Sequence, residues 1–185
     1  MYKSIIYCIV LTMAMISTTQ AQLLYTKEAK VSFESEAPVE KIEATTHKGL
    51  TVLDLSTGML EWSVLINAFE FEKKLMQEHF NENYMESEKW PKAIFKGKVM
   101  DYDKLTNDWE GTLTIRVVGE LTIRDITKAV ETEALFTKDE TGYIGKSKLV
   151  VACADYGIEI PKVVRNNIAK EVEIHLEANY TPLER

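Results

Sequence analysis

The chain has 185 residues, a net charge of −7 at pH 7 and 45% hydrophobic residues. An acidic chain in which no tract concentrates Lys and Arg is not typical of a nucleic-acid-binding protein. Its length suits one domain with a sizeable core, and no apolar run after the first 21 residues is long enough to span a membrane, which takes about 20 residues.

Residues 1–21 have the three parts of a secretory signal. Lys3 supplies the basic start, residues 5–16 form a short apolar centre, and Thr19-Gln20-Ala21 offers small residues where a signal peptidase cleaves. We therefore expect a mature single domain of residues 22–185, starting near Gln22, in the periplasm or secreted. An N-terminal membrane anchor is the alternative interpretation.

Only Cys153 remains after such processing, so the mature chain cannot form an internal disulfide. Its neighbours are apolar, which predicts a buried, unreactive thiol.

Alternation of apolar and polar residues predicts strands over residues 30–35, 39–46, 50–55 and 59–66. A turn at His47-Lys48-Gly49 separates the second from the third, and Ser56-Thr57-Gly58 joins the third to the fourth as a hairpin.

The stretch that follows has a different period. After the alternating pair Phe69 and Phe71, apolar residues recur every fourth position at Met76, Phe80 and Tyr84, with charged residues between them. This predicts an amphipathic helix of about four turns, ended by Trp90-Pro91. A single helix among strands must lay its apolar side on the sheet, so we expect it to cover the β body as a lid.

Further strands are predicted over residues 93–102, 111–124, 129–136, 143–154 and 168–180, with polar or irregular connections at 103–108 and 155–167. The longest contains two near repeats, G-T-L-T-I-R and G-E-L-T-I-R, eight residues apart. The even offset puts Leu113, Ile115, Val117, Leu121 and Ile123 on one face. About eight strands, one helix and no βαβ spacing predict an all-β, antiparallel up-and-down barrel.

Three motifs in order, together with the helical stretch, resemble those of the YceI-like family of secreted, lipocalin-like lipid-binding proteins. They are G-E-L-T-I-R-D-I-T-K at 119–128, D-Y-G-I at 155–158 and I-A-K-E-V at 168–172. Asp125 stands where the family usually has glycine; Asp tolerates the left-handed conformation that such a turn needs. Residues 23–55 match only loosely.

The resemblance implies an eight-stranded, lipocalin-like barrel whose elongated apolar interior binds a polyisoprenoid or another long-chain lipid. The residues expected to contact this ligand are Phe69, Phe71, Met76, Phe80, Tyr84, Phe95, Leu113, Ile115, Val117, Leu121, Ile123, Leu149, Val151 and Tyr156.

An eight-stranded barrel can also be packed solid. The alternative is therefore a filled barrel that acts as a protein-interaction module through its acidic helix and residues 155–167. The sequence leaves the lipid's identity and the pairing of two copies into a homodimer open.

An enzyme is not expected. His47, His79 and His175 lie on three separate elements without metal-ligand spacing, and no nucleotide-binding or nucleophile motif occurs. We expect no cofactor and no metal, and we expect His79 and His175 to be solvated side chains.

Overall fold

The computed structural model describes residues 23–106, 109–140 and 142–183. Within them, eight long antiparallel strands form a closed barrel in the order β1-β2-β3-β5-β6-β7-β8-β9, and β9 pairs back onto β1. The predicted all-β, up-and-down barrel is confirmed. The expected signal peptide, residues 1–21, and the expected start at Gln22 lie outside the described residues.

The strands are β1 (Leu23–Glu36), β2 (Lys41–Asp54), β3 (Met59–Leu65), β4 (Glu70–Phe71), β5 (Lys92–Val99), β6 (Gly111–Ile123), β7 (Ile126–Asp139), β8 (Gly142–Ala152) and β9 (Glu171–Pro182). The helical segments are η1 (Ile66–Ala68), α2 (Lys74–His79), η2 (Phe80–Tyr84), α3 (Asp103–Thr106), η3 (Cys153–Tyr156) and η4 (Lys162–Val164). The two-residue strand β4 pairs with β2.

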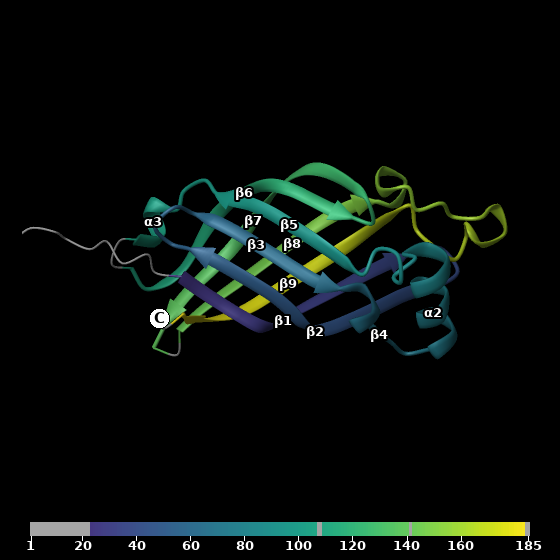
Figure 1. Ribbon diagram of the computed structural model, residues 1–185, viewed down its shortest axis with the longest axis horizontal. Coiled ribbons are helices and arrows are strands. Elements are labelled where there is room, and N and C mark those ends of the chain that lie inside the picture. The colour runs from purple at the N-terminus through teal and green to yellow at the C-terminus, as the bar shows by residue number, and fades with distance from the viewer. Residues whose placement is uncertain (1–22, 107–108, 141, 184–185) are drawn as a thin grey trace, which may run out of the picture.

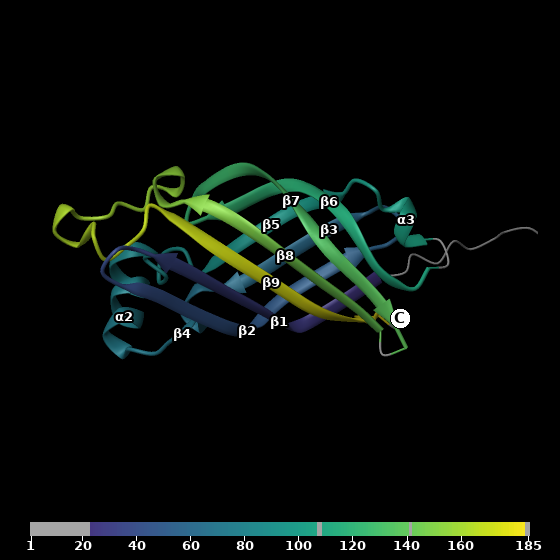
Figure 2. The ribbon, with the colours of Figure 1, turned by 180° about the vertical axis from the view of Figure 1, so that it is seen from behind.

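The barrel is elongated, and its two ends carry different elements (Figures 1 and 2). At one end lie α3 and the last residues of β9. At the other lie α2 and the connection from β8 to β9 that contains η3 and η4. We call these the α3 end and the α2 end.

The α3 end is filled with side chains. Its buried cluster consists of Leu24, Ala29, Leu53, Leu55, Leu60, Val99, Leu105, Ile115, Val117, Phe136, Ala178 and Tyr180. The rings of Trp109, Tyr143 and Tyr180 each lie within 6.0 Å of the Phe136 ring, measured between centroids. Inward-facing residues of neighbouring strands therefore interdigitate into a solid core at this end.

The turn predicted at residues 47–49 does not exist, because β2 runs unbroken from Lys41 to Asp54. The register with β1 shifts on both sides of the Ala29–Gly49 pair, so each strand carries one extra residue there. A Cβ on Gly49 would lie 2.8 Å from the carbonyl oxygen of Ala29. The glycine therefore permits a close approach of two bent strands, which a sequence pattern can mistake for a turn.

The predicted four-turn helix is also shorter than expected. Six α-helical residues (α2) run into the π-helical turn η2, in which the Met85 amide donates to the Phe80 carbonyl. Glu86 then takes a left-handed conformation with φ of 46°. The helix thus ends at Tyr84, before the expected stop at Trp90-Pro91. Part of the predicted 103–108 loop forms α3, and β1 begins at Leu23 rather than at residue 30.

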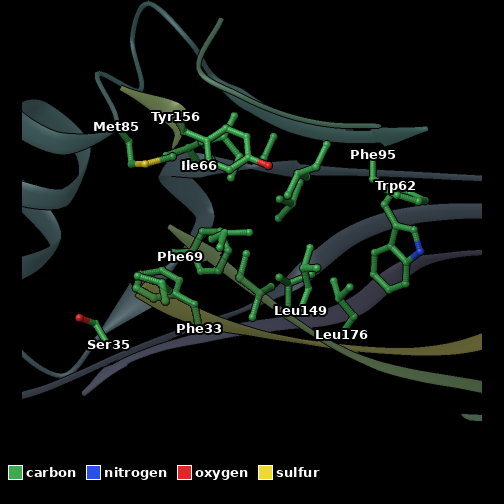
Figure 3. A pocket seen from close by; sticks show the side chains of 18 of the residues that line it. Phe33, Ser35, Trp62, Ile66, Phe69, Met85, Phe95, Leu149, Tyr156 and Leu176 are labelled. Carbon is green, nitrogen blue, oxygen red and sulfur yellow. The ribbon is translucent and has the colours of Figure 1, made fainter. Parts of the chain in front are cut away.

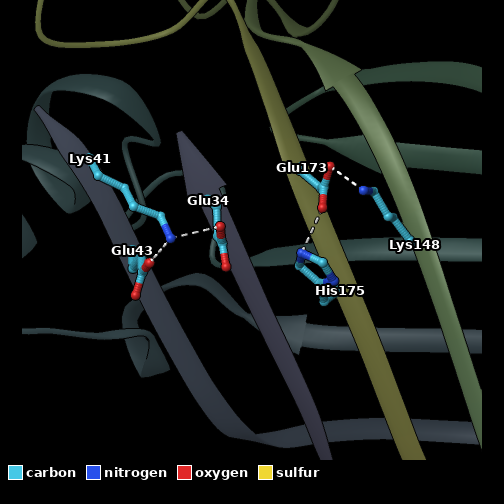
Figure 4. Close-up of polar contacts among 6 residues, drawn as sticks. All are labelled: Glu34, Lys41, Glu43, Lys148, Glu173 and His175. Atoms are coloured by element: carbon cyan, nitrogen blue, oxygen red, sulfur yellow. Dashed lines mark ion pairs between the residues drawn. The ribbon is translucent and has the colours of Figure 1, made fainter. Parts of the chain in front are cut away.

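Charged side chains pair on the outer face of β1, β2, β8 and β9 (Figure 4). Lys41 contacts Glu34 and Glu43. Lys148 pairs with one carboxylate oxygen of Glu173 at 2.5 Å, which lowers the pKa of Glu173, and Nε2 of His175 lies 2.9 Å from the other oxygen. His175 lies on the polar face, as predicted, although it is half-buried rather than freely solvated. Exposed pairs of this kind add little stability individually.

Candidate functional site

A cavity of about 620 Å³ occupies the barrel interior (Figure 3). All eight barrel strands contribute to its lining, and so do α2, η2 and the β8–β9 connection. Its volume lies within the range of about 300–1,000 Å³ that is common for small-molecule sites. The barrel is therefore hollow between the α3-end core and α2, and not packed solid along its whole length.

The α3-end core borders the cavity, and we call this boundary the floor. Residues such as Leu53, Val99 and Phe136 form it. Tyr180 also belongs to this floor, and its hydroxyl lies 3.1 Å from the hydroxyl of Thr51, which is fully buried. Burial raises the pKa of Tyr180 well above its ordinary range. The Tyr180 hydroxyl at the floor therefore stays uncharged at neutral pH.

Four phenylalanine rings form the wall beneath η2. The Phe80 ring stacks on Phe33 with centroids 5.3 Å apart and lies 5.0 Å from Phe71 and 6.0 Å from Phe69. Phe33 and Phe69 are themselves 5.3 Å apart. Such ring pairs add stability beyond the area that they bury. They join the lid segment to the barrel, because Phe33 comes from β1 and Phe80 from η2.

The structure brings almost all of the predicted ligand-contacting residues to this one cavity. Those on its lining are Phe69, Phe71, Met76, Phe80, Tyr84, Phe95, Ile115, Val117, Leu121, Ile123, Leu149, Val151 and Tyr156. Leu113 is the exception: it packs against the α3-end core and does not border the cavity. The prediction identified its inward face correctly, but residues near the start of β6 lie beyond the floor.

Several cavity residues were not predicted, among them Phe33, Trp62, Ile66, Met85 and Leu176. Phe33, Trp62 and Leu176 were identifiable, since each alternates with other apolar residues on a predicted strand. Met85 was not, because the π-helical turn places the buried position five residues after Phe80 instead of four. Met85 is 7% exposed, whereas Tyr84 remains half-buried.

The start of the β8–β9 connection closes one side of the cavity. Cys153 and Tyr156 of η3 are buried, and Gly157 follows with φ of 63°, a conformation that favours glycine. Burial raises the pKa of the Cys153 thiol, which therefore stays protonated, in agreement with the predicted unreactive cysteine. The Tyr156 hydroxyl is buried and has no hydrogen-bond partner among the described residues.

Arg124 joins three segments at the α2 end. Its guanidinium donates to the Gly157 carbonyl at 2.8 Å, pairs with Glu86 and lies 4.4 Å from the centre of the Trp90 ring. Arg124 itself has φ of 57°, so it is the left-handed residue of the β6–β7 turn. The sequence had predicted Asp125 for this position, which was wrong. These contacts offset the cost of about 1–2 kcal/mol that a left-handed non-glycine residue carries.

Polar groups at the α2 end lie near the rim of the cavity. Lys73 pairs with Glu40 at 2.8 Å, which ties α2 to the β1–β2 connection and lowers the pKa of Glu40. His79 and Asn167 also border the cavity, and His79 is exposed, as predicted. The lining therefore changes from charged at the rim to apolar within.

Among the described residues, no three or more His, Cys, Asp or Glu side chains are grouped so that they could hold a metal ion. No helix in the described part of the chain has the length and apolar character needed to cross a membrane.

Comparison with known proteins adds a family and a set of similar folds. The model of the YceI-like domain matches residues 12–180. No curated protein matches the chain. Among solved structures, a polyisoprenoid binding domain from Saccharophagus degradans, implicated in plant cell wall breakdown, superposes with a TM-score of 0.76 at 12% identity. That match covers 89% of this chain and 100% of the other.

Two further structures are similar. BcnA of Burkholderia cenocepacia has a TM-score of 0.65 at 17% identity, covering 82% of this chain and 96% of its own. The YceI protein of Campylobacter jejuni has a TM-score of 0.54 at 12% identity, covering 74% of this chain and 81% of its own. At these identities the likeness concerns the fold alone.

Proposed function

Because the chain belongs to the YceI-like domain family, we propose that it binds a long-chain apolar lipid, such as a polyisoprenoid, in the barrel interior and catalyses no reaction. The observation that carries this proposal is the 620 Å³ cavity, most of whose lining residues are aliphatic or aromatic. The similar fold of the polyisoprenoid binding domain from Saccharophagus degradans supports the choice of ligand class.

The energetics favour a long chain. Each methylene that leaves water contributes about 0.8 kcal/mol, so ten buried carbons contribute about 8 kcal/mol. Association costs several kcal/mol of translational and rotational freedom, which shorter chains do not offset. A slender hydrocarbon therefore binds without a strong polar contact. The alternative function, a protein-interaction module whose barrel is filled with side chains, is less favoured, because the barrel contains a cavity.

We also propose that the protein acts outside the cytoplasm, on the basis of the signal pattern in residues 1–21. Intact-mass measurement of the protein from the cells that make it should give a chain starting at or near Gln22. A full-length chain retained in the membrane would contradict this proposal.

Two measurements test whether the protein binds a lipid: extraction of a bound compound and retention of an added one. Protein purified without detergent should release a long-chain apolar compound into organic solvent. It should also retain added geranylgeraniol through gel filtration.

Two tryptophan variants on β8 supply a matched pair. Val151→Trp puts a ring into the cavity and should reduce the bound lipid. Val150→Trp makes the same change on the outer face, where Val150 is 52% exposed, and should leave lipid binding intact. No extractable lipid and no retained geranylgeraniol in the unmodified protein would refute the lipid-binding role.

A further inference from the structure

The three most exposed large apolar side chains of the described chain all lie at the α2 end. Val163 of η4 is 90% exposed, Val39 of the β1–β2 connection is 67% exposed and Leu75 of α2 is 61% exposed. The Val39 amide donates to the Asn166 carbonyl at 3.1 Å, and an ion pair joins α2 to the same connection. Single exposed apolar residues are ordinary, but three at one end of an elongated barrel indicate a surface that a partner covers.

The outermost part of this end is the segment of residues 160–170, which contains η4 and which we call the tip segment. It projects beyond the barrel in both views (Figures 1 and 2). The tip segment has an ordered structure, because η4 forms a turn and the Ala169 amide donates to the Ser35 hydroxyl oxygen at 2.9 Å. Val164 borders the cavity, whereas Val163 does not border it and is open to solvent.

The tip segment is basic in an otherwise acidic chain. It contains three bases and no acid: Lys162, Arg165 and Lys170. All three are exposed, and none of them forms an ion pair with a residue that the structure describes. Glu159 and Glu171 immediately precede and follow the segment, and the whole chain has a net charge of −7. The positive charge is therefore confined to the projection, on both sides of Val163 in the sequence.

An exposed aliphatic side chain between bases fits an anionic lipid bilayer better than it fits a protein. A bilayer takes up an apolar side chain at the level of its headgroups, and its negative surface attracts neighbouring Lys and Arg. A stable protein interface instead needs about 800 Å² on each partner and is commonly anchored by aromatic residues. The exposed large apolar residues of the described chain are Val, Leu and Met, with no aromatic residue among them.

We propose that the tip segment docks the protein, end on, onto the surface of an anionic lipid bilayer. Val163 enters the headgroup region, and Lys162 and Arg165 pair with lipid phosphates. The same surface repels the acidic barrel, so the barrel points away from the membrane. Docking needs no ligand in the cavity and goes beyond the proposed lipid binding, but it places the α2 end of the cavity against the bilayer.

Cosedimentation with lipid vesicles tests the docking. The protein should bind vesicles of equimolar phosphatidylglycerol and phosphatidylcholine at low ionic strength, and the binding should weaken as salt is added. Vesicles of phosphatidylcholine alone should bind it much more weakly. No binding to the anionic vesicles would overturn the proposal.

Two double variants of equal net charge locate the contact. Lys162→Gln/Arg165→Gln should weaken binding to the anionic vesicles by about tenfold or more, because each base near such a surface adds to the attraction. Lys27→Gln/Lys48→Gln removes the same charge from exposed positions on the barrel wall and should leave binding nearly unchanged. Equal losses in the two variants would mean that net charge governs the binding, which would overturn the assignment to the tip segment.

A dye at the tip reports insertion directly. Val163→Cys is labelled with acrylodan, and the label goes to the introduced thiol because Cys153 is buried. Its emission should shift to shorter wavelength when anionic vesicles are added, whereas the same dye on Val150→Cys, on the outer face of β8, should not shift. No shift at position 163, or an equal shift at both positions, would contradict insertion of the tip. Retention of geranylgeraniol without vesicles is measured separately, so a failure of docking is distinguished from a failure of lipid binding.

Discussion

At the α3 end, the rings of Trp109, Tyr143 and Tyr180 pack around Phe136 in a buried cluster. Toward the α2 end, the same eight strands surround a cavity of about 620 Å³ that is lined by Leu149, Val151 and the rings beneath η2. The alternation of apolar and polar residues is alike in both regions. Which half is solid depends on side-chain size and on the elements that close each end, and not on the strand pattern.

The largest expected difference between the two ends concerns the removal of one core side chain. Phe136 is 2% exposed, so Phe136→Ala should lower the free energy of unfolding by about 3–5 kcal/mol. Leu149→Ala should cost about 1 kcal/mol, because Leu149 already borders free space and loses only part of its transfer energy. Urea denaturation measures both values. Equal costs would mean that the cavity is not free space.

The next prediction concerns the attachment of the lid segment. Phe80 contacts three other rings, so Phe80→Ala should cost about 2–3 kcal/mol, somewhat less than for a fully buried ring. Glu82→Ala changes an exposed residue of the same turn and should stay within about 0.5 kcal/mol. If thermal melts showed equally mild effects, η2 would not be docked on the barrel as described.

Gly119→Ala tests the boundary between the filled and the hollow region. Gly119 pairs with Gly97, and a Cβ on Gly119 would lie 2.5 Å from the Gly97 Cα and 2.7 Å from the Phe95 ring. Overpacking of this kind costs about 1–3 kcal/mol. Because the Phe95 ring lines the cavity, its displacement should also reduce lipid binding. An unchanged melting temperature together with unchanged binding would contradict this geometry.

The smallest expected effect is at the floor. Tyr180→Phe leaves the buried Thr51 hydroxyl without its partner and should cost about 1–2 kcal/mol at neutral pH. The folded state raises the pKa of Tyr180, whereas the unfolded chain releases this proton near pH 10. Stability of the unmodified protein should therefore fall as the pH rises above about 10.

Tyr180→Phe should lose less stability over that alkaline range, because it lacks the titrating hydroxyl. Chemical denaturation at pH 8 and at pH 10.5 gives the comparison. Identical losses in the two proteins would mean that Tyr180 titrates normally.

The fold was largely predictable because alternation reports which face of a strand is buried. It placed Ile115, Leu121 and Val151 correctly on the interior. It also placed Leu113 there correctly, but alternation has no information on the position along the barrel axis, and Leu113 lies in the filled half. Whether the interior is hollow depends on the total volume of all inward-facing side chains relative to the space inside the barrel. The alternation pattern of single strands does not predict that total.

The errors at Gly49, Met85 and Arg124 have one physical origin. Each lies where the backbone departs from regular geometry: a pair of bulges, a π-helical turn and a left-handed residue. Tertiary contacts stabilise these departures, as when Glu86, Trp90 and Gly157 hold Arg124. Local sequence does not contain those contacts, so it predicted a turn at Gly49, a regular helical stripe that omits Met85, and a left-handed Asp125 in place of Arg124.

The pairing of β9 with β1 makes the backbone hydrogen bonds a continuous ring. The girth of such a ring follows from the strand number and stagger, so it cannot expand without breaking ladder hydrogen bonds. The volume of the interior can therefore differ only along the axis, at the end where α2 and the β8–β9 connection lie outside the strand ladder (Figure 1). If the barrel binds a lipid as proposed, its fixed girth should exclude broad, fused-ring molecules, whereas chains of different lengths should fit along the axis.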